Sequence, residues 1–194
     1  RLVRVNGTYE YPADFILVAA MNPCKCGFFP DLGKCRCTPT QIRRYLNRVS
    51  GPFLDRIDIG VEVPRQDLGM MAAEKSIDEG SFPQTEQRDS SAVMRARVME
   101  ARARQEKRFA DESISYNSQM TRRQIEEYCR LSGEDAVFLE KVERQQGISA
   151  RGHGKILKVA RTLADLDGQA EIGRAQLAEA IGFRSFEKKY WGSL

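Results

Sequence analysis

Apolar positions in the first third of the chain follow the spacing of β-strands. The run FILVAA at residues 15–20 is continuously apolar, which is typical of a strand buried on both faces in a parallel sheet. Residues 57–63, IDIGVEV, alternate between apolar and polar side chains and so predict a strand with one buried face. Asn6-Gly7, inside the alternating stretch 3–11, is a strong signal for a hairpin turn.

Helical periodicity and helix-start signals dominate further along the chain. Thr38 and Gln41 form a capping box before a helix whose apolar face starts at Ile42, and the Ser-Gly-Pro sequence at 50–52 ends that helix. After residue 91 the pattern is helical throughout. The expected helices are one at about 92–110, one capped by Thr121, one capped by Ser132 and closed by Gly147, one opened by Ser149, and one that carries Leu177, Ala180 and Ile181.

The stretch between these two parts has no clear periodicity. Ser, Glu, Gln, Asp, Gly and Pro dominate from Arg65 to Ser90, which is typical of a linker or a mobile insertion. We therefore expect an α/β segment at residues 1–66, a linker or insertion at 67–91 and an all-helical segment at 92–194.

Charge and composition narrow the class of protein. The net charge of +4, from 31 Lys and Arg against 27 Asp and Glu, permits a nucleic-acid or nucleotide partner without requiring one. No run of about 18 apolar residues is present and no signal peptide opens the chain, so we expect no membrane span. Residue 1 is Arg and not Met, so we expect the sequence to be part of a longer protein. Five cysteines, an odd number, point away from a disulfide framework and toward the cytoplasm.

Four of the five cysteines fall in one short stretch. Cys24-x-Cys26 and Cys35-x-Cys37 are separated by eight residues, and four thiolates are a ligand set that tetrahedral Zn²⁺ takes in structural sites. The C-x-C spacing is a weaker zinc signal than C-x-x-C, so four reduced thiols on a surface loop are the alternative. Cys129 lies on a helical pattern and is expected to pack in the core.

The same stretch contains a near match to a phosphate-binding loop. GFFPDLGKC, residues 27–35, places five residues between its glycines and a cysteine where G-x-x-x-x-G-K-[ST] needs a hydroxyl. The sequence also shows no strand that ends in an acidic pair suited to magnesium. We therefore expect that this chain alone hydrolyses no nucleotide.

Two arginines occupy positions where an anion would be a natural ligand. Arg56 precedes a strand pattern, and its guanidinium suits a phosphate on a neighbouring subunit or, alternatively, a weak surface pair with Asp55 or Asp58. Arg151 is expected in the first turn of a helix, where the helix dipole disfavours a cation, so that an anionic ligand or plain solvation must account for it.

The expected helix at 92–110 carries six basic residues, among them Arg104 and Arg108. Such a helix could touch nucleic acid, but the glutamates interspersed with these residues favour a solvated face.

Three stretches carry a family resemblance. FILVAAMNPCKCG (15–27), CTPTQIRRYLNRVSGPFLDRIDIGVEVP (37–64) and ISARGHGKILKVARTLADLDG (148–168) resemble the magnesium-chelatase-like AAA+ ATPases of bacteria, the YifB/ComM group. The resemblance runs from the hairpin to about Arg184 and is weakest at 65–90 and in the last ten residues. Gly152 and Gly154 depart from the bulkier residues expected at those positions and would weaken the helix start.

The resemblance implies roles for three polar residues. Asn22 matches the sensor 1 residue, which helps to position the attacking water near the γ-phosphate. Arg56 matches the arginine finger, which completes the ATP site of the adjacent subunit, and Arg151 matches the sensor 2 arginine of the helical lid. Residues 1–66 would then be the C-terminal part of an AAA+ core, and 92–194 a helical lid of the magnesium-chelatase C-terminal type. ATP and Mg²⁺ would be held mainly by elements upstream.

The resemblance also implies a cytoplasmic ring of identical subunits, hexameric, that uses ATP to remodel branched DNA in natural transformation or recombination. The ATPase subunit of a magnesium chelatase is the alternative within the family. A non-catalytic helical binding module stabilised by zinc is the alternative from another class. A third possibility is a folded lid with a disordered N-terminal portion, because the two predicted core strands would have unpaired edges.

Overall fold

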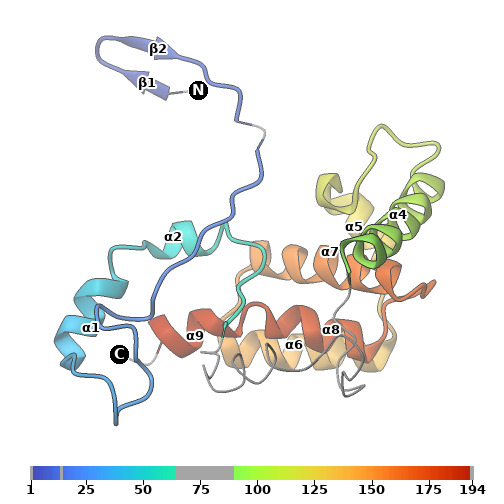
Figure 1. Ribbon diagram of the computed structural model, residues 1–194. Helices are drawn as coiled ribbons and strands as arrows, with labels where there is room; N and C mark the ends of the chain where they lie inside the picture. Colours follow the sequence, from blue (N-terminus) through green and yellow to red (C-terminus); the bar gives the residue numbers. More distant parts are fainter. Residues whose placement is uncertain (1, 14, 64–89, 193–194) are drawn as a thin grey trace, which may run out of the picture. The chain divides into compact units, whose positions relative to one another are not determined.

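The computed structural model describes residues 2–13, 15–63 and 90–192. The chain divides into two compact units, Arg1–Leu46 and Asn47–Leu194. Figure 1 labels the helices and strands of both units. The predicted linker at 67–91 lies outside the described residues except for its last two.

The first unit opens with the predicted hairpin. Strands β1 (Leu2–Arg4) and β2 (Gly7–Tyr9) pair in antiparallel fashion, with Arg4 opposite Gly7. Gly7 has φ of 145°, a backbone conformation that a side chain at this position would strain. The turn signal in the sequence is therefore confirmed.

The prediction of two core strands, at residues 15–20 and 57–63, is wrong. Residues 15–20 and 57–63 have no regular secondary structure and form no β-ladder, and Ile16 and Val18 of the first run are 92% and 89% exposed. A central strand exists only where neighbouring strands accept and donate its backbone hydrogen bonds. Within the described part of the chain, the hairpin is the only sheet, so the described residues up to 63 contain irregular chain and short helices in place of the expected α/β layer.

A capped helix closes the first unit. Helix α1 (Pro39–Leu46) begins after Thr38, whose backbone N–H donates to Gln41 Oε1 over 3.0 Å, while the Gln41 backbone N–H donates to Thr38 Oγ1 over 3.3 Å. This is the predicted capping box. Ile42 and Leu46 are buried one turn apart on the same face.

Helices make up almost all regular structure in the second unit. A single-turn helix, α2 (Gly51–Leu54), begins within the predicted Ser-Gly-Pro break, with Ser50 as its N-cap residue, and is followed by a segment without regular secondary structure. From residue 90 to 192 the described elements are α4 (Ser91–Arg108), the 3₁₀ turn η1 (Asn117–Gln119), α5 (Arg122–Tyr128), α6 (Gly133–Gln146), α7 (Ala150–Leu166), α8 (Arg174–Gly182) and α9 (Ser185–Trp191). We call α4 to α9 the helical domain.

Local sequence signals account for where these helices begin and end. Thr121 and Gln124 form the predicted capping box of α5, and the Ser132 and Ser149 hydroxyls each accept a backbone N–H at the start of α6 and α7. Gly147 ends α6 in the left-handed conformation, with φ of 69°. The all-helical character expected after residue 91 is confirmed.

Helix α7 is the centre of the helical domain and packs against α4, α5, η1 and α8. Its predicted apolar face is buried in one cluster with residues from the surrounding helices. The fully enclosed members of this cluster include Leu139, Ile156, Ala160, Ala164, Leu177 and Ala180. Cys129 is also buried in the cluster, as predicted.

A buried ion network joins α4, η1 and α7. Asp165 is fully buried and accepts hydrogen bonds from Arg108 Nη1 and Asn117 Nδ2, each over 2.8 Å, while Arg161 Nη2 lies 3.2 Å from its other oxygen. Arg104 donates to the Asp165 backbone carbonyl. The basic face of α4 is therefore not solvated throughout, because two of its arginines hold α4 to α7.

No helix in the described ranges has both the length and the apolar composition needed to cross a bilayer.

Candidate functional site

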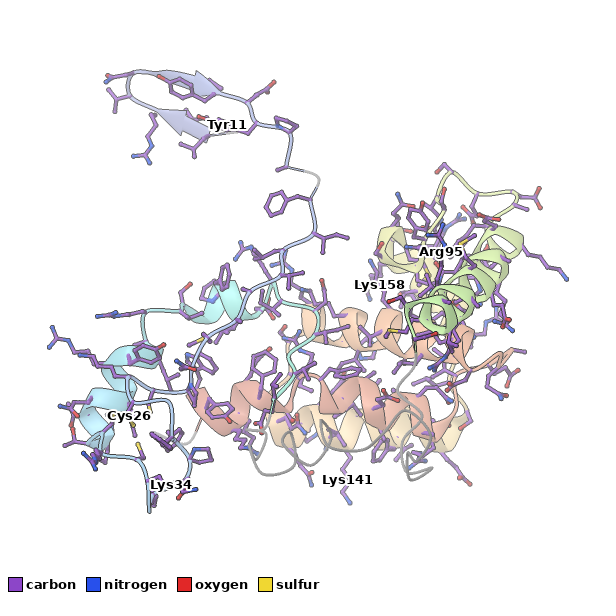
Figure 2. The ribbon with its side chains drawn as sticks, viewed as in Figure 1. Tyr11, Cys26, Lys34, Arg95, Lys141 and Lys158 are labelled. Atoms are coloured by element: carbon purple, nitrogen blue, oxygen red, sulfur yellow. The ribbon has the colours of Figure 1, made fainter. Side chains whose placement is uncertain are left out.

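The four clustered cysteines converge in the first unit. We call residues 24–37 the cysteine loop; Cys26 is labelled in Figure 2. The Sγ atoms of Cys24, Cys26, Cys35 and Cys37 all lie within 4.8 Å of one another. Cys24 is fully buried, and the other three are partly exposed.

Two tight turns bring the C-x-C pairs together. The Gly27 backbone N–H donates to the Cys24 carbonyl over 3.1 Å, and Gly27 has φ of 77°, which favours glycine. In the second turn the Asp31 carbonyl accepts the Cys35 backbone N–H over 2.8 Å, and the Asp31 side chain accepts that of Gly33 over 3.0 Å. Backbone geometry therefore presents all four thiols to one point.

The surroundings shift the pKa values of two of these thiols in opposite directions: the pKa of Cys26 is lowered and that of Cys35 is raised. Backbone N–H groups of Phe28 and Arg36 lower the pKa of Cys26 to about 6. The backbone N–H of Cys37 lowers the pKa of Cys35, but burial and hydrogen bonds with Cys26 and Cys24 outweigh it and raise this pKa to about 11. Four thiolates so close together repel one another, so a cation is needed to hold all four ionised.

The spacing of the Cys24, Cys26 and Cys35 sulfurs fits tetrahedral zinc. Zn–S bonds of about 2.3 Å place tetrahedral sulfurs about 3.8 Å apart. Three sulfur pairs in the loop are separated by 3.4, 3.8 and 3.6 Å. The Phe29 backbone N–H also points at Cys24 Sγ over 3.5 Å, a contact of the kind that supports metal-bound sulfur.

Asn22, which matches the sensor 1 residue, is exposed and precedes the cysteine loop by two residues. It belongs to a different compact unit from Arg56 and Arg151. Its assignment stays a prediction.

Arg56 lies two residues after the end of helix α2 and has an exposed side chain. Its guanidinium donates to the Pro52 carbonyl over 2.5 Å. Its own backbone carbonyl accepts a hydrogen bond from Lys155 Nζ over 2.5 Å. The residue is therefore fixed at its backbone while much of its side chain faces solvent.

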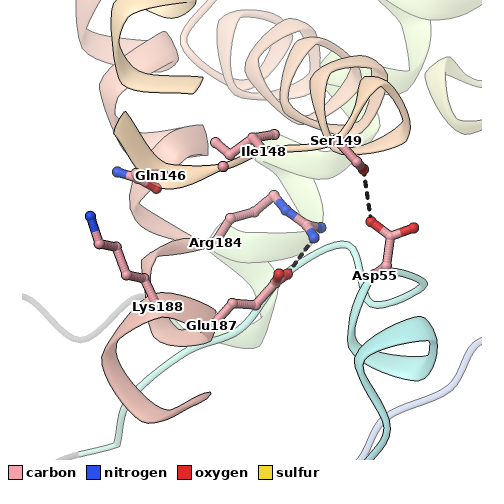
Figure 3. Close-up of a pocket in the computed structure, with 8 residues that line it drawn as sticks. Asp55, Gln146, Ile148, Ser149, Arg184, Glu187 and Lys188 are labelled. Atoms are coloured by element: carbon pink, nitrogen blue, oxygen red, sulfur yellow. Dashed lines mark hydrogen bonds and ion pairs between the residues drawn. The ribbon is translucent and has the colours of Figure 1, made fainter. Parts of the chain in front are cut away.

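Arg151 lies in the first turn of α7, as predicted, and its side chain is 59% exposed. Asp55 provides the anion near Arg151, because Asp55 Oδ2 lies 3.7 Å from Arg151 Nη1. Ser149 Oγ donates to Asp55 Oδ1 over 3.0 Å (Figure 3). A carboxylate at this helix end is favoured by the dipole. Asp55 was expected to pair, if at all, with Arg56; the structure pairs it with Arg151.

Close packing in the same turn explains why residue 152 is a glycine. A Cβ at this position would lie 2.7 Å from Ile148 Cγ2, so a larger residue would displace the chain that leads into α7. The glycine therefore permits close packing at the helix start.

A small pocket of about 100 Å³ opens beside the Asp55–Ser149 contact (Figure 3). Arg184 forms one wall; it is 5% exposed, pairs with Glu187 and donates through Nη1 to the Ile57 carbonyl over 2.7 Å. Burial raises the pKa of Glu187, although Arg184 opposes the shift. The remaining lining residues are Asp55, Gln146, Gly147, Ile148, Ser149 and Lys188.

Sequence reasoning missed Asp55, Lys155 and Arg184 as parts of this site. Lys155 and Arg184 contact the segment after α2 across 99 and 127 residues of sequence, so no local pattern could identify them. The helix-start position of Arg151 was the one usable signal, because it pointed to an anion nearby.

Comparison with known proteins agrees with the resemblance in the sequence. Residues 1–71 match the family described as magnesium chelatase, subunit ChlI, and residues 88–184 match its C-terminal counterpart. The competence protein ComM of Haemophilus influenzae is 41% identical over 183 residues, which cover 94% of this chain and 33% of that protein.

Two further relatives have no assigned function. YifB of Escherichia coli is 41% identical over 187 residues, which cover 96% of this chain and 34% of YifB. An uncharacterized protein of Mycobacterium bovis is 33% identical over 184 residues, which cover 95% of this chain and 34% of that protein. This chain spans about a third of the length of these curated relatives. With both of its parts matched and relatives found along nearly its whole length, the chain belongs to the magnesium chelatase ChlI family, on the branch that includes ComM and YifB.

Proposed function

We propose that this chain is the C-terminal part of an AAA+ ATPase that works as a hexameric ring and remodels branched DNA. One observation carries the ATPase part of the proposal. Arg56 and Arg151, the two residues matched to phosphate-contacting arginines, lie in one compact unit and are connected through Asp55. Both present exposed guanidiniums, whose planar donors suit phosphate oxygens.

The two arginines would serve different subunits. Arg151 would contact the phosphates of ATP bound to its own subunit, and Arg56 those of ATP bound to the neighbour. The P-loop and the acidic ligand for Mg²⁺ would come from other parts of the whole protein, because this sequence has neither. In other phosphoryl-transfer systems, an arginine supplied in trans stabilises the transition-state charge and increases kcat by a factor of about 10³ to 10⁵.

DNA as the substrate rests on the resemblance to the ComM and YifB group, together with the net charge of +4. The ATPase subunit of a magnesium chelatase is the second candidate, and the family match favours it equally. The two candidates differ in what stimulates hydrolysis, since only a DNA motor responds to branched DNA.

The test is the ATPase rate of the full-length protein with and without forked DNA, for wild type, Arg56→Ala and Arg151→Ala. Arg122→Ala is the matched control, because Arg122 is exposed and pairs only weakly with Glu126 on the surface. We expect stimulation by the fork and a loss of about 10³-fold or more in kcat for Arg56→Ala. Hydrolysis indifferent to DNA would favour a chelatase-like role, and absence of hydrolysis would reject the motor.

We also propose that the cysteine loop binds one structural Zn²⁺ through Cys24, Cys26, Cys35 and Cys37. Four protein ligands leave no open position for substrate, so the ion would stabilise the fold and take no part in catalysis. The test is the zinc content of purified protein: one ion per chain in wild type and in Cys129→Ser, and none in Cys26→Ser. Zinc retained alongside a complete lack of ATPase activity would favour the non-catalytic binding module.

A further inference from the structure

The segment that carries Arg56 is docked on the helical domain along its length. We call residues 55–60 the finger segment. It lies in the same compact unit as the helical domain. Its contacts are Asp55 with Ser149 Oγ, the Arg56 carbonyl with Lys155 Nζ, the Asp58 carboxylate with Lys155 Nζ, the Ile57 carbonyl with Arg184 Nη1, and the Gly60 backbone N–H with the Phe183 carbonyl.

Lys155 is the central contact. It stands one helical turn after Arg151 on α7, so both side chains leave the same face. Its side chain is 16% exposed, and its ammonium group lies 2.5 Å from the Arg56 carbonyl and 2.8 Å from Asp58 Oδ1. A single cation therefore holds the finger segment on both sides of Ile57.

Arg184 makes the second attachment from the junction of α8 and α9. Its buried guanidinium donates to the Ile57 carbonyl over 2.7 Å and is neutralised by Glu187. Hydrogen bonds from a charged donor are about twice as strong as neutral ones. The backbone on the C-terminal side of Arg56 is thus bonded at consecutive carbonyls, those of Arg56 and Ile57.

Gly60 allows the end of the segment to reach the domain. A Cβ at this position would lie 2.2 Å from the Phe186 ring, closer than packed atoms approach. The close approach in turn permits the 2.9 Å hydrogen bond from Gly60 N–H to the Phe183 carbonyl. These bonds take the place that a neighbouring strand would fill for an alternating segment of this kind.

We propose that Lys155 and Arg184 are positioning residues for Arg56, which fix it to the helical domain so that Arg56 and Arg151 move as one rigid body. This inference rests on the proposed ATPase function. In a ring, movement of the helical domain on its own nucleotide would then shift Arg56 relative to the nucleotide of the next subunit. The coupling would be carried by Lys155 and Arg184, and neither residue needs to touch ATP.

The test compares Lys155→Met, Lys155→Arg and Lys158→Met in the full-length protein. Lys158 is the matched control: it is a second partly buried lysine on α7, and its ammonium group donates to the Ser118 carbonyl instead of the finger segment. We expect Lys155→Met to lower kcat about 10- to 100-fold, as displacement of a catalytic group by about 1 Å does, with KM changed little. Lys155→Arg should restore most of the rate, and Lys158→Met should match wild type.

A second variant, Gly60→Ala, disturbs the docking of the finger segment without a change of charge. Gly60→Ala should lower kcat in the same direction, whereas Gly133→Ala, where an added Cβ meets nothing within 4 Å, should not. Hydrogen exchange in the peptide that spans 55–60 provides a readout independent of turnover. It should accelerate in Lys155→Met and Gly60→Ala and stay at the wild-type rate in both controls.

The outcomes separate this inference from the proposed function. Wild-type kcat and wild-type exchange in Lys155→Met, with Arg56→Ala inactive, would overturn the positioning role and leave the ATPase proposal standing. If the full-length protein hydrolyses no ATP, the ATPase proposal fails. The exchange data then still decide whether Lys155 fixes the finger segment, and an unchanged rate in Lys155→Met would overturn that role as well.

Discussion

The first unit, which contains the cysteine loop, and the helical domain belong to one chain, yet they differ in how much apolar surface they bury. Among the described residues of the first unit, buried apolar side chains are limited to Cys24, Ile42 and Leu46, whereas the helical domain buries twelve in one cluster. A unit of about 40 residues rarely stabilises itself by apolar burial alone and often recruits a metal or disulfides. The contrast agrees with the proposal that zinc stabilises the first unit, whereas apolar packing stabilises the second.

The largest expected effect comes from removing the metal. Structural zinc sites of this type contribute about 10–16 kcal/mol of apparent binding free energy at pH 7, and that energy is lost when the ion leaves. We expect chelation to abolish hydrogen-exchange protection in the cysteine loop while the helical domain keeps its protection and its Tm. Cys26→Ser should behave like chelated protein, and Cys129→Ser should keep the loop protected.

Hydrogen exchange after chelation would test directly whether the cysteine loop and the helical domain are stabilised independently. Loss of protection in both regions after chelation would show that they fold as one cooperative unit. A loop that stays protected without metal would show that its turns and hydrogen bonds suffice, and would reject the zinc proposal.

The second effect should fall on the helical domain alone. Asp165→Ala removes the shared acceptor of Arg108, Arg161 and Asn117, and leaves two guanidiniums without their buried counter-charge. Breaking a buried pair in this way costs about 3–5 kcal/mol. Chemical denaturation followed by helical circular dichroism should show this loss, with zinc content unchanged.

Glu126→Ala is the control for Asp165→Ala, because its ion pair with Arg122 is exposed and should contribute about 0–1 kcal/mol. Equal losses in the two variants would mean that the buried network adds nothing beyond a surface pair. Zinc loss in Asp165→Ala would contradict the independence of the two regions.

The same contrast explains how much the sequence could reveal. Helix starts at Thr38, Thr121, Ser132 and Ser149 were predicted correctly, because a cap depends on residues three positions apart. The clustering of four cysteines was equally visible, since two turns within fourteen residues create it. Local chemistry was therefore readable from the sequence.

Contacts between distant segments were not readable. The alternation at 57–63 predicted a strand, but Arg184 and the Phe183 carbonyl bind part of this stretch to helices instead. Alternation shows that one side of a segment is favoured for burial, and does not show whether a strand or a helix pair provides the partner. The ion pair between Asp55 and Arg151 was likewise not predicted, because Arg151 lies on α7, far from Asp55 in the sequence.

The smallest expected effect is a pH dependence at the start of α6. A hydrogen bond from Arg174 and a second from Ser132 lower the pKa of Asp135 below its usual value of 3.8. Between the lowered pKa and 3.8 the unfolded state binds more protons than the folded state, so stability rises with pH there. The contribution of the carboxylate is complete above this window and is lost as pH falls through the lowered pKa.

We therefore expect Asp135→Asn to destabilise the helical domain near neutral pH by less than Asp165→Ala, because Asp135 lies at the edge of the core. The difference from wild type should shrink as pH falls below 3.8, and urea titrations from pH 6 downward measure it. In an Arg174→Met background most of the difference should already be absent, because the main cause of the lowered pKa is gone. A difference that stays constant with pH would show that Asp135 acts through packing at the helix start and not through its charge, and the role of Arg174 would then have to be structural as well.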